Sequence, residues 1–335
     1  MIYNPPMGGG ASDPYVTGNP ATATPGSIPP GAAIEQPQRE IVNVIMAAGL
    51  TPSAANVGQL LQAIQVLGRI RLTGPSTFYV ATPASGGSDA TGNGTLAAPW
   101  ATLGHAYSML FNFYDAGGNS ITIQLAAGTY APVNCIGAVP GCPALLIVGN
   151  TSNPASVIIS NTTGAFGSAC VYAFFATPLY ISGITVNGLV SNGGGFCADT
   201  GGFIAFQNCN FGNMGASGYH LGTWGSGRIN ITGNYTINGS ASVHLFQQGG
   251  FVQVNTATAA LVTVTLTGIP NFSAAFIAAA LASQAILLNA LIVFSGAASG
   301  VKFTAWTGGG IYSGNNFASF PTGLTAGSIV GGYTS

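Results

Sequence analysis

The chain has 335 residues, and only 3% of them carry a charged side chain, against about 25% in an ordinary soluble domain. With a net formal charge of -1 there is no excess of Lys and Arg to neutralise phosphates, which argues against nucleic-acid binding. Because 47% of the residues are hydrophobic, there is ample material for a core. Because the surface carries so few charges, we expect identical chains or other neighbours to cover much of it.

The N-terminal segment, 1–30, is rich in Gly, Pro, Ala, Thr and Asn and shows no hydrophobic periodicity. It predicts an extended arm that is flexible or becomes ordered against a partner. The opening MIYNPPMGGG has neither a basic nor an apolar region, so we expect no signal peptide.

Apolar residues at helical spacing predict two helices, over 32–48 and 54–70, separated by a glycine turn. Pro37 must then lie in the first turn or two of the first helix. A hairpin of this size, within 31–74, is too small for a core of its own. We therefore expect it to pack against sister chains or a larger assembly.

From Thr77 onward, short β-branched runs recur, each bounded by Gly, Asn or Ser. Their starts are roughly 10 to 25 residues apart, which is too close for βαβ units of about 30 residues or more. The spacing fits either a β-sandwich or a solenoid of short strands. The runs are 121–125, 145–148, 157–159, 179–186, 203–211, 229–237, 251–254 and 261–266.

Three segments favour the solenoid: ISGITVNG (181–188), FIAFQNCNFGN (203–213) and INITGNYTING (229–239). Each consists of two β runs broken by Gly or Asn, which tolerate the left-handed corner between the sheets of a coil. Asn side chains at equivalent corners are also expected to stack as amide ladders. We predict a right-handed single-stranded parallel β-helix over 75–335, with the sandwich as the alternative.

The predicted β-helix needs protection at its first coil, because an open strand edge templates aggregation. Asp89 marks a turn, and Pro99, Trp100 and Thr102 lead into a predicted capping helix near 101–111.

The terminal coils, 270–335, contain an apolar run from Ala274 to Phe294. Its length raises the question of a membrane span, but polar residues lie in its middle and no Lys or Arg flanks it. We therefore expect no membrane insertion. Instead, Asn271 or Ser273 is predicted to cap a short buried helix from Ala274 to about Leu281, followed by a buried strand.

The chain has five cysteines: Cys135, Cys142, Cys170, Cys197 and Cys209. Their odd number and the lack of a CxxC pair argue against a disulfide framework or a zinc site. We expect small buried thiols, with a Cys135–Cys142 loop disulfide as the alternative, and we expect no metal and no cofactor.

Three stretches resemble phage tail fibre and tailspike sequences. GSIPPGAAIEQPQREIVNVIMAAGLTPSAANVGQLLQAIQ (26–65) resembles the N-terminal segment of many tailed-phage fibre proteins. TFYVATPASGGSDATGNGTLAAPWATLGHAYSML (77–110) is similar to the opening of pectate-lyase-like β-helices. Residues 270–335, with FSG, Pro-x-Gly and GGxY elements, resemble the closing segment of phage β-helix fibres. The middle of the chain, about 111–269, has no such resemblance and shares only the pattern of short strands.

The resemblance implies a homotrimeric protein of the phage virion, assembled in the cytoplasm of the bacterial host. Residues 1–74 would attach it to tail, portal or baseplate proteins, and the β-helix would bind polysaccharide of the host surface as receptor.

Many phage spikes of this fold cleave polysaccharide, and glycoside hydrolysis usually needs two carboxylates about 5 to 10 Å apart. The predicted β-helix holds only Asp89, Asp115 and Asp199, the first two in turn contexts. The candidates for catalysis are Asp199 with His220 or Arg228 of a neighbouring chain. The alternative for each is a hydrogen-bonded structural side chain.

Binding has more sequence support, because flat rings stack on sugar faces and amides hydrogen-bond hydroxyls. Tyr219, His220 and Trp224 lie in the polar, Gly-rich segment GASGYHLGTWGSGR and are the predicted surface residues for glycan binding. Half or more of the aromatic residues in the middle coils are expected in the core. These aromatic residues are Tyr172, Phe174, Phe175, Tyr180, Tyr219, Trp224, Tyr235 and Phe246.

Three functions remain open from the sequence. The favoured one is a tail spike or fibre without enzymatic activity that binds host-surface glycan. The alternatives are a polysaccharide depolymerase with a site between subunits and a purely structural collar or tail fibre.

Overall fold

The computed structural model describes residues 3–164, 168–255, 260–280, 284–286, 292–306, 308–312, 320–330 and 333–334. The chain divides into two compact units, Met1–Ile70 and Arg71–Ser335. The division falls close to the predicted boundary between residues 74 and 75.

The N-terminal unit contains η1 (Pro20–Thr22) and two helices that contact each other, α1 (Gly31–Ala47) and α2 (Gln59–Leu67). Both predicted helices are present, but α2 begins later than predicted, at Gln59 instead of Ala54. The Asn56 side chain accepts a hydrogen bond from the Gly58 N–H at 3.0 Å, and Gln59 Oε1 accepts one from the Ser53 N–H at 2.7 Å. Such local bonds to side chains offer the backbone an alternative to the helix.

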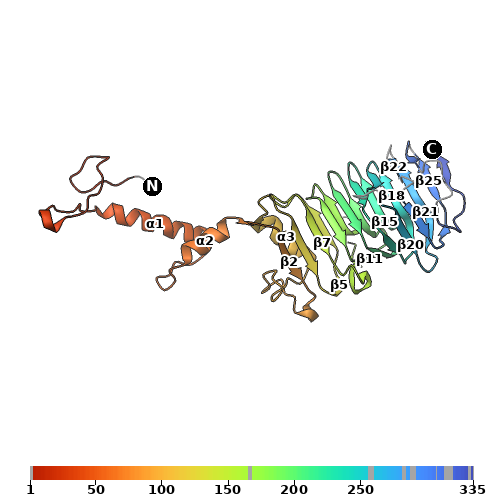
Figure 1. Ribbon diagram of the computed structural model, residues 1–335, viewed down its shortest axis with the longest axis horizontal. Coiled ribbons are helices and arrows are strands. Elements are labelled where there is room, and N and C mark those ends of the chain that lie inside the picture. The colour runs from red at the N-terminus through yellow and green to blue at the C-terminus, as the bar shows by residue number, and fades with distance from the viewer. Residues whose placement is uncertain are drawn as a thin grey trace. The chain divides into compact units, whose positions relative to one another are not determined.

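The second unit is a parallel β-solenoid (Figure 1), in which the chain from β4 to β23 visits three sheets in turn and lays one strand on each during a coil. The strand pairings described within these sheets are parallel. The predicted parallel β-helix is therefore confirmed, and the sandwich alternative is excluded. Ala169, Gly194 and Tyr219 occupy paired positions of three successive coils, so the interval between them measures the length of one coil.

The strands described by the structure have the following bounds. The ten-stranded sheet contains β2 (Ser76–Val80), β4 (Ile121–Leu125), β7 (Leu145–Val148), β10 (Leu179–Ser182), β13 (Phe203–Gln207), β16 (Arg228–Ile231), β19 (Phe251–Val254), β22 (Gln284–Ile286), β26 (Gly310–Tyr312) and β28 (Tyr333–Thr334). The seven-stranded sheet contains β5 (Gly128–Tyr130), β8 (Val157–Asn161), β11 (Thr185–Gly188), β14 (Asn210–Met214), β17 (Tyr235–Ile237), β20 (Val262–Leu266) and β23 (Ile292–Ser295). The nine-stranded sheet contains β6 (Val133–Ile136), β9 (Ala169–Phe174), β12 (Gly194–Ala198), β15 (Tyr219–Trp224), β18 (Ala241–Gln248), β21 (Asn271–Ala280), β24 (Ser299–Gly300), β25 (Phe303–Trp306) and β27 (Ser328–Val330). The remaining short elements are β1 (Ile70–Arg71), β3 (Tyr114–Asp115), η2 (Pro83–Ser85) and η3 (Pro154–Ser156).

Apolar side chains of all three sheets point inward and fill the coils. β4 shows why its sequence ITIQL forms such a strand, because its first, third and fifth side chains are buried. At the corners, Asn208 and Gly183 adopt left-handed backbone conformations, with φ of 50° and 72°. An amide pair joins adjacent coils where Gln253 Nε2 donates to Asn230 Oδ1 at 2.8 Å, but it lies within strands rather than at the predicted corner.

Helix α3 (Leu103–Phe113) confirms the predicted capping helix. The Thr102 hydroxyl accepts a hydrogen bond from the His105 N–H at 3.1 Å, and Asp89 in turn accepts bonds from the N–H groups of Ala101 and Thr102. The helix packs against β2, β3 and β6, with Leu103 among its buried residues.

The predicted helix from Ala274 to Leu281 is wrong. Residues up to Ala280 belong to β21, which pairs with β18 over Val243–Ala275 and Leu245–Ile277. Pairing with the preceding coil therefore overrides the helical preference of an alanine-rich segment. Residues 281–283 and 287–291 lie outside the described residues. In the part of the chain that is described, no helix is both long and apolar enough to cross a membrane.

The five cysteines are buried free thiols, as predicted, and the alternative Cys135–Cys142 disulfide is not formed.

Candidate glycan-binding groove

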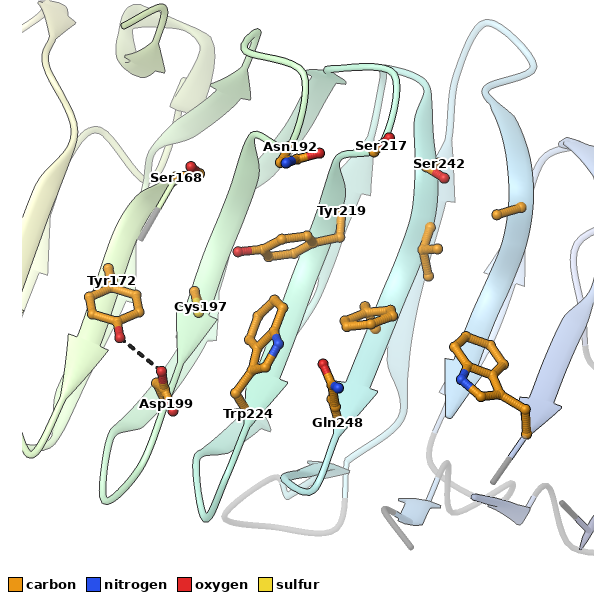
Figure 2. A pocket seen from close by; sticks show the side chains of 14 residues that line it. Ser168, Tyr172, Asn192, Cys197, Asp199, Ser217, Tyr219, Trp224, Ser242 and Gln248 are labelled. Carbon is orange, nitrogen blue, oxygen red and sulfur yellow. Dashed lines mark hydrogen bonds between the residues drawn. The ribbon is translucent and has the colours of Figure 1, made fainter. Parts of the chain in front are cut away.

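The outer face of the nine-stranded sheet is hollowed into a groove of about 650 Å³ (Figure 2). It extends over successive coils from β9 to β25, so residues that are distant in the sequence lie along one surface. The lining residues are Ser168, Tyr172, Asn192, Cys197, Asp199, Ser217, Tyr219, Trp224, Ser242, Val243, Phe246, Gln248, Ala274 and Trp306.

Aromatic rings form a continuous strip in the groove. The ring centroids of Tyr219 and Trp224 are 5.0 Å apart, those of Trp224 and Phe246 are 5.3 Å apart, and those of Phe246 and Trp306 are 6.4 Å apart. Trp224, Phe246 and Trp306 are only partly buried, so part of each side chain is accessible. Partly exposed rings in a concave surface are suited to stacking on the apolar face of a ligand.

Two glycines create the space in which the rings lie. A Cβ atom on Gly194 would approach the Tyr219 ring to 2.3 Å, and one on Gly222 would approach both Tyr219 and Trp224 to 2.4 Å. Real Cβ atoms do not come so close, so a side chain at either position would displace the rings. Gly194 pairs with Tyr219 in the next coil, which explains why the Tyr219 ring lies over the glycine of the preceding coil.

Polar side chains flank the aromatic strip. Figure 2 shows Ser168, Asn192, Ser217 and Ser242 in a row along one side of the groove, each from a different coil. Gln248 adds an amide at the other end of the strands. Hydroxyl and amide groups beside apolar rings can hydrogen-bond a polar ligand and fix its orientation.

Asp199 follows β12 and is held by three hydrogen bonds. Its Oδ2 accepts from the Tyr172 hydroxyl at 2.8 Å (Figure 2), and its Oδ1 accepts from Thr200 N at 2.6 Å and Thr200 Oγ1 at 3.0 Å. Burial and the bond to Asp199 raise the pKa of Tyr172, so this phenol remains protonated and keeps donating.

Tyr219 and Trp224 both line the groove on the outer face, and Trp224 is partly exposed. The predicted surface display of Tyr219 is wrong, because this residue is only 8% exposed and lies in a buried cluster with Tyr172 and Cys197. Burial raises the pKa of the Tyr219 hydroxyl as well.

The predicted surface display of His220 is wrong, because its side chain is 0% exposed. It points into the core, where its Nε2 lies 3.0 Å from the Gly212 carbonyl and its Nδ1 lies 3.1 Å from His244 Nδ1. The Tyr235 hydroxyl lies 2.9 Å from His244 Nε2. The error arose because Tyr219 and His220 share one polar segment, while a strand sends neighbouring side chains to opposite faces.

The buried histidines are held neutral. Burial lowers the pKa of His220 to about 3, and burial together with the neighbouring His220 lowers the pKa of His244 well below its usual value. Two neutral rings satisfy the network with His220 Nε2–H donating to Gly212, His244 Nδ1–H donating to His220, and the Tyr235 hydroxyl donating to His244.

The structure does not bring the three candidate catalytic residues together. Asp199 lies at the groove, His220 is inside the core, and Arg228 is exposed on β16 of the ten-stranded sheet, 5.8 Å from the centre of the Phe251 ring. Since His220 is fully buried, it is inaccessible to an Asp199 of another chain. Asp115 accepts a hydrogen bond from the Gly117 N–H at 2.8 Å, which is the turn role expected for it.

Several groove residues were not found from the sequence. Trp306, Cys197 and the serine row were not recognised, and the two glycines looked like composition in a glycine-rich chain. Their only sequence signal is a spacing of about one coil between equivalent positions, and that spacing can be used only after the coil length is known.

No protein-family model, curated protein or solved structure matches this chain, so the comparisons neither assign it to a family nor supply a function.

Proposed function

We propose that this chain is a tail spike or tail fibre protein of a bacteriophage virion that binds polysaccharide of the host surface in the groove of its nine-stranded sheet. The observation that supports glycan binding is the continuous strip of Tyr219, Trp224, Phe246 and Trp306 beside a row of hydroxyl and amide groups. Rings stack on the apolar faces of sugars, while the polar row is placed to bond their hydroxyls. The phage assignment rests on the sequence resemblances at both ends of the chain.

The proposal includes a homotrimer attached to the virion through residues 1–74. Exposed apolar residues of α1 and α2 support an association through this segment, because large apolar side chains such as Ile34, Met46, Leu61 and Ile64 are more than half exposed. The three-fold symmetry and the attachment to tail, portal or baseplate proteins come from the resemblance alone.

We propose binding rather than cleavage. Among the described residues that line the groove, Asp199 is the sole carboxylate, and hydrolysis by the usual route needs a second one across the scissile bond. A depolymerase would therefore require a carboxylate from elsewhere.

The test is to titrate the purified full chain against a panel of bacterial surface polysaccharides and to follow both binding and chain length. We expect at least one polysaccharide to bind without being shortened. Trp224→Ala and Phe246→Ala should each weaken this binding roughly tenfold, from the loss of about 1.5 kcal/mol of stacking. The matched control is Tyr180→Ala, because Tyr180 is an exposed aromatic residue on the ten-stranded sheet.

Equal binding by Trp224→Ala and the unmodified chain would place the glycan elsewhere, and absence of binding across the panel would overturn the glycan-binding proposal. Shortened chains would establish the depolymerase alternative. Labelling with antibodies on phage particles tests the virion assignment, with a distal tail position expected.

A further inference from the structure

The groove has a single charged group among its described lining residues, the Asp199 carboxylate. Elsewhere the lining consists of aromatic, aliphatic, thiol, hydroxyl and amide groups. In so apolar a surface one carboxylate has a large effect on which ligands are accepted, because charge interactions are stronger next to low-dielectric material than in open water.

Asp199 has room for one more hydrogen-bond donor. A carboxylate offers about four acceptor positions. Three of them are filled by Tyr172 and by two groups of Thr200, which also fix its orientation. The carboxylate is therefore positioned by the protein, and its Oδ2 keeps an acceptor position beyond the one filled by Tyr172.

Trp224 occupies the position next to Asp199 in the following coil, and its indole ring extends over Gly222. Ala198 of β12 pairs with Thr223 of β15, so the residues that follow them, Asp199 and Trp224, occupy neighbouring positions of adjacent coils. Both line the groove (Figure 2). Indole faces attract cations, and an aromatic ring beside a carboxylate is suited to an ammonium group.

We propose that the groove selects glycans that carry a free, protonated amino group, such as unacetylated amino sugars, and seats that ammonium between the Asp199 carboxylate and the Trp224 ring. This inference rests on the proposed glycan-binding function and specifies its ligand. Uronic acids and other anionic sugars are disfavoured at the same position, because their carboxylates would face that of Asp199.

A merely structural role for Asp199 makes a different prediction. Asn at this position keeps an oxygen that can accept from both groups of Thr200, and its amide can donate to the Tyr172 hydroxyl. Asp199→Asn thus preserves the local hydrogen bonds while it removes the charge. If Asp199 served only the turn, the variant would bind every glycan like the unmodified chain.

The experiment measures calorimetric affinities for matched oligosaccharides built on glucosamine and on galactosamine, each with free amines and fully N-acetylated, together with an oligogalacturonate. The unmodified chain should bind a free-amine oligosaccharide about tenfold or more tightly than its acetylated partner, the range expected for a charge-assisted hydrogen bond. In Asp199→Asn this ratio should fall to roughly two or less, with the affinity for the acetylated partner nearly unchanged. Asp115→Asn is the control, because it removes one charge from a turn that does not line the groove.

The outcomes separate the two proposals. Equal binding of aminated and acetylated oligosaccharides, tighter binding of oligogalacturonate, or an amine preference that survives in Asp199→Asn overturns the inference and leaves glycan binding in place. Failure of every oligosaccharide to bind overturns the inference and counts against the proposed function as well.

Discussion

The inner and outer faces of the nine-stranded sheet use the same residue types for different purposes. Tyr219 and His220 are consecutive residues of β15, yet Tyr219 contacts the groove while His220 is enclosed in the core. On the inner face, Phe196 of β12 contacts Phe206 and Phe211 with centroid distances of 5.4 and 5.2 Å. Rings that pack on all sides contribute to stability, whereas the partly exposed rings outside are available to a ligand.

The buried His220 on the inner face should make the free energy of unfolding depend on pH. This is the largest effect that we expect. Because the folded-state pKa of His220 is about 3, below its unfolded value of 6.5, the unfolded chain binds more protons at low pH. The contribution of the neutral His220 to the free energy of unfolding is fully present above pH 6.5. It is lost as pH falls toward 3, and the loss amounts to roughly 5 kcal/mol. Urea unfolding at several pH values in this window measures it.

The contribution of His220 is easier to detect because the chain has only six acidic side chains, so few carboxylates titrate in the same pH range. His105→Gln is the control, because His105 is only partly buried and lies outside the network. The free energy of unfolding of this variant should follow the same pH curve. A free energy of unfolding that does not change between pH 6.5 and 3 would contradict a buried, neutral His220.

Removal of one ring from the core and one from the groove compares the two environments directly. Phe211→Ala leaves a cavity among fully buried rings and should lower the free energy of unfolding by about 3 to 5 kcal/mol. Phe246→Ala, on the groove side, should cost only about 1 to 2 kcal/mol, because its ring is partly exposed already. Chemical denaturation of both variants gives the comparison, and equal costs would show that the outer strip is a second core rather than a binding surface.

Gly222→Ala tests the outer face without removing a ring. The added methyl group meets the Tyr219 and Trp224 rings at 2.4 Å and must displace them, so we expect glycan affinity to fall by roughly tenfold, about 1.4 kcal/mol. Gly104→Ala, on α3, is the matched control, since its Cβ meets nothing within 4 Å. Unchanged affinity in Gly222→Ala would mean that the glycan does not depend on the positions of these two rings.

Tyr172→Phe should have the smallest effect. It removes one donor to Asp199 and leaves the ring in the groove. We expect affinity for aminated glycans to fall roughly two- to tenfold, which corresponds to about 0.5 to 1.5 kcal/mol for one hydrogen bond. Calorimetric titration against the acetylated partner shows whether the loss is confined to the amine.

The coils were predictable because their signal is local. β4 alternates apolar and polar residues, and Gly or Asn marks the corners, so short strands in a solenoid follow from the segments themselves. The alanine-rich β21 was missed because its strand conformation depends on pairing with β18, which belongs to the preceding coil.

The groove was less predictable because it depends on register. Tyr219 pairs with Gly194 in the preceding coil and with Val243 in the following one, and these two intervals in the sequence are unequal. No fixed period therefore aligns the strip. His220 and Leu221 are consecutive residues of β15 and are both enclosed in the core. Because the strand departs from strict alternation here, its sequence does not predict which side chains face the groove.

From β9 to β18 the coils are nearly equal in length, which makes this part of the groove modular. Deletion of 194–218 would remove one complete coil, which is one strand from each of the three sheets, and bring Tyr219 onto the partner position of Ala169. A binding surface constructed in this way can be shortened or extended by one strand width, about 4.8 Å, at a time, without redesign of its neighbours. For the proposed glycan ligand, duplication and loss of single coils offer a route by which the length of the bound segment can change while the fold is retained.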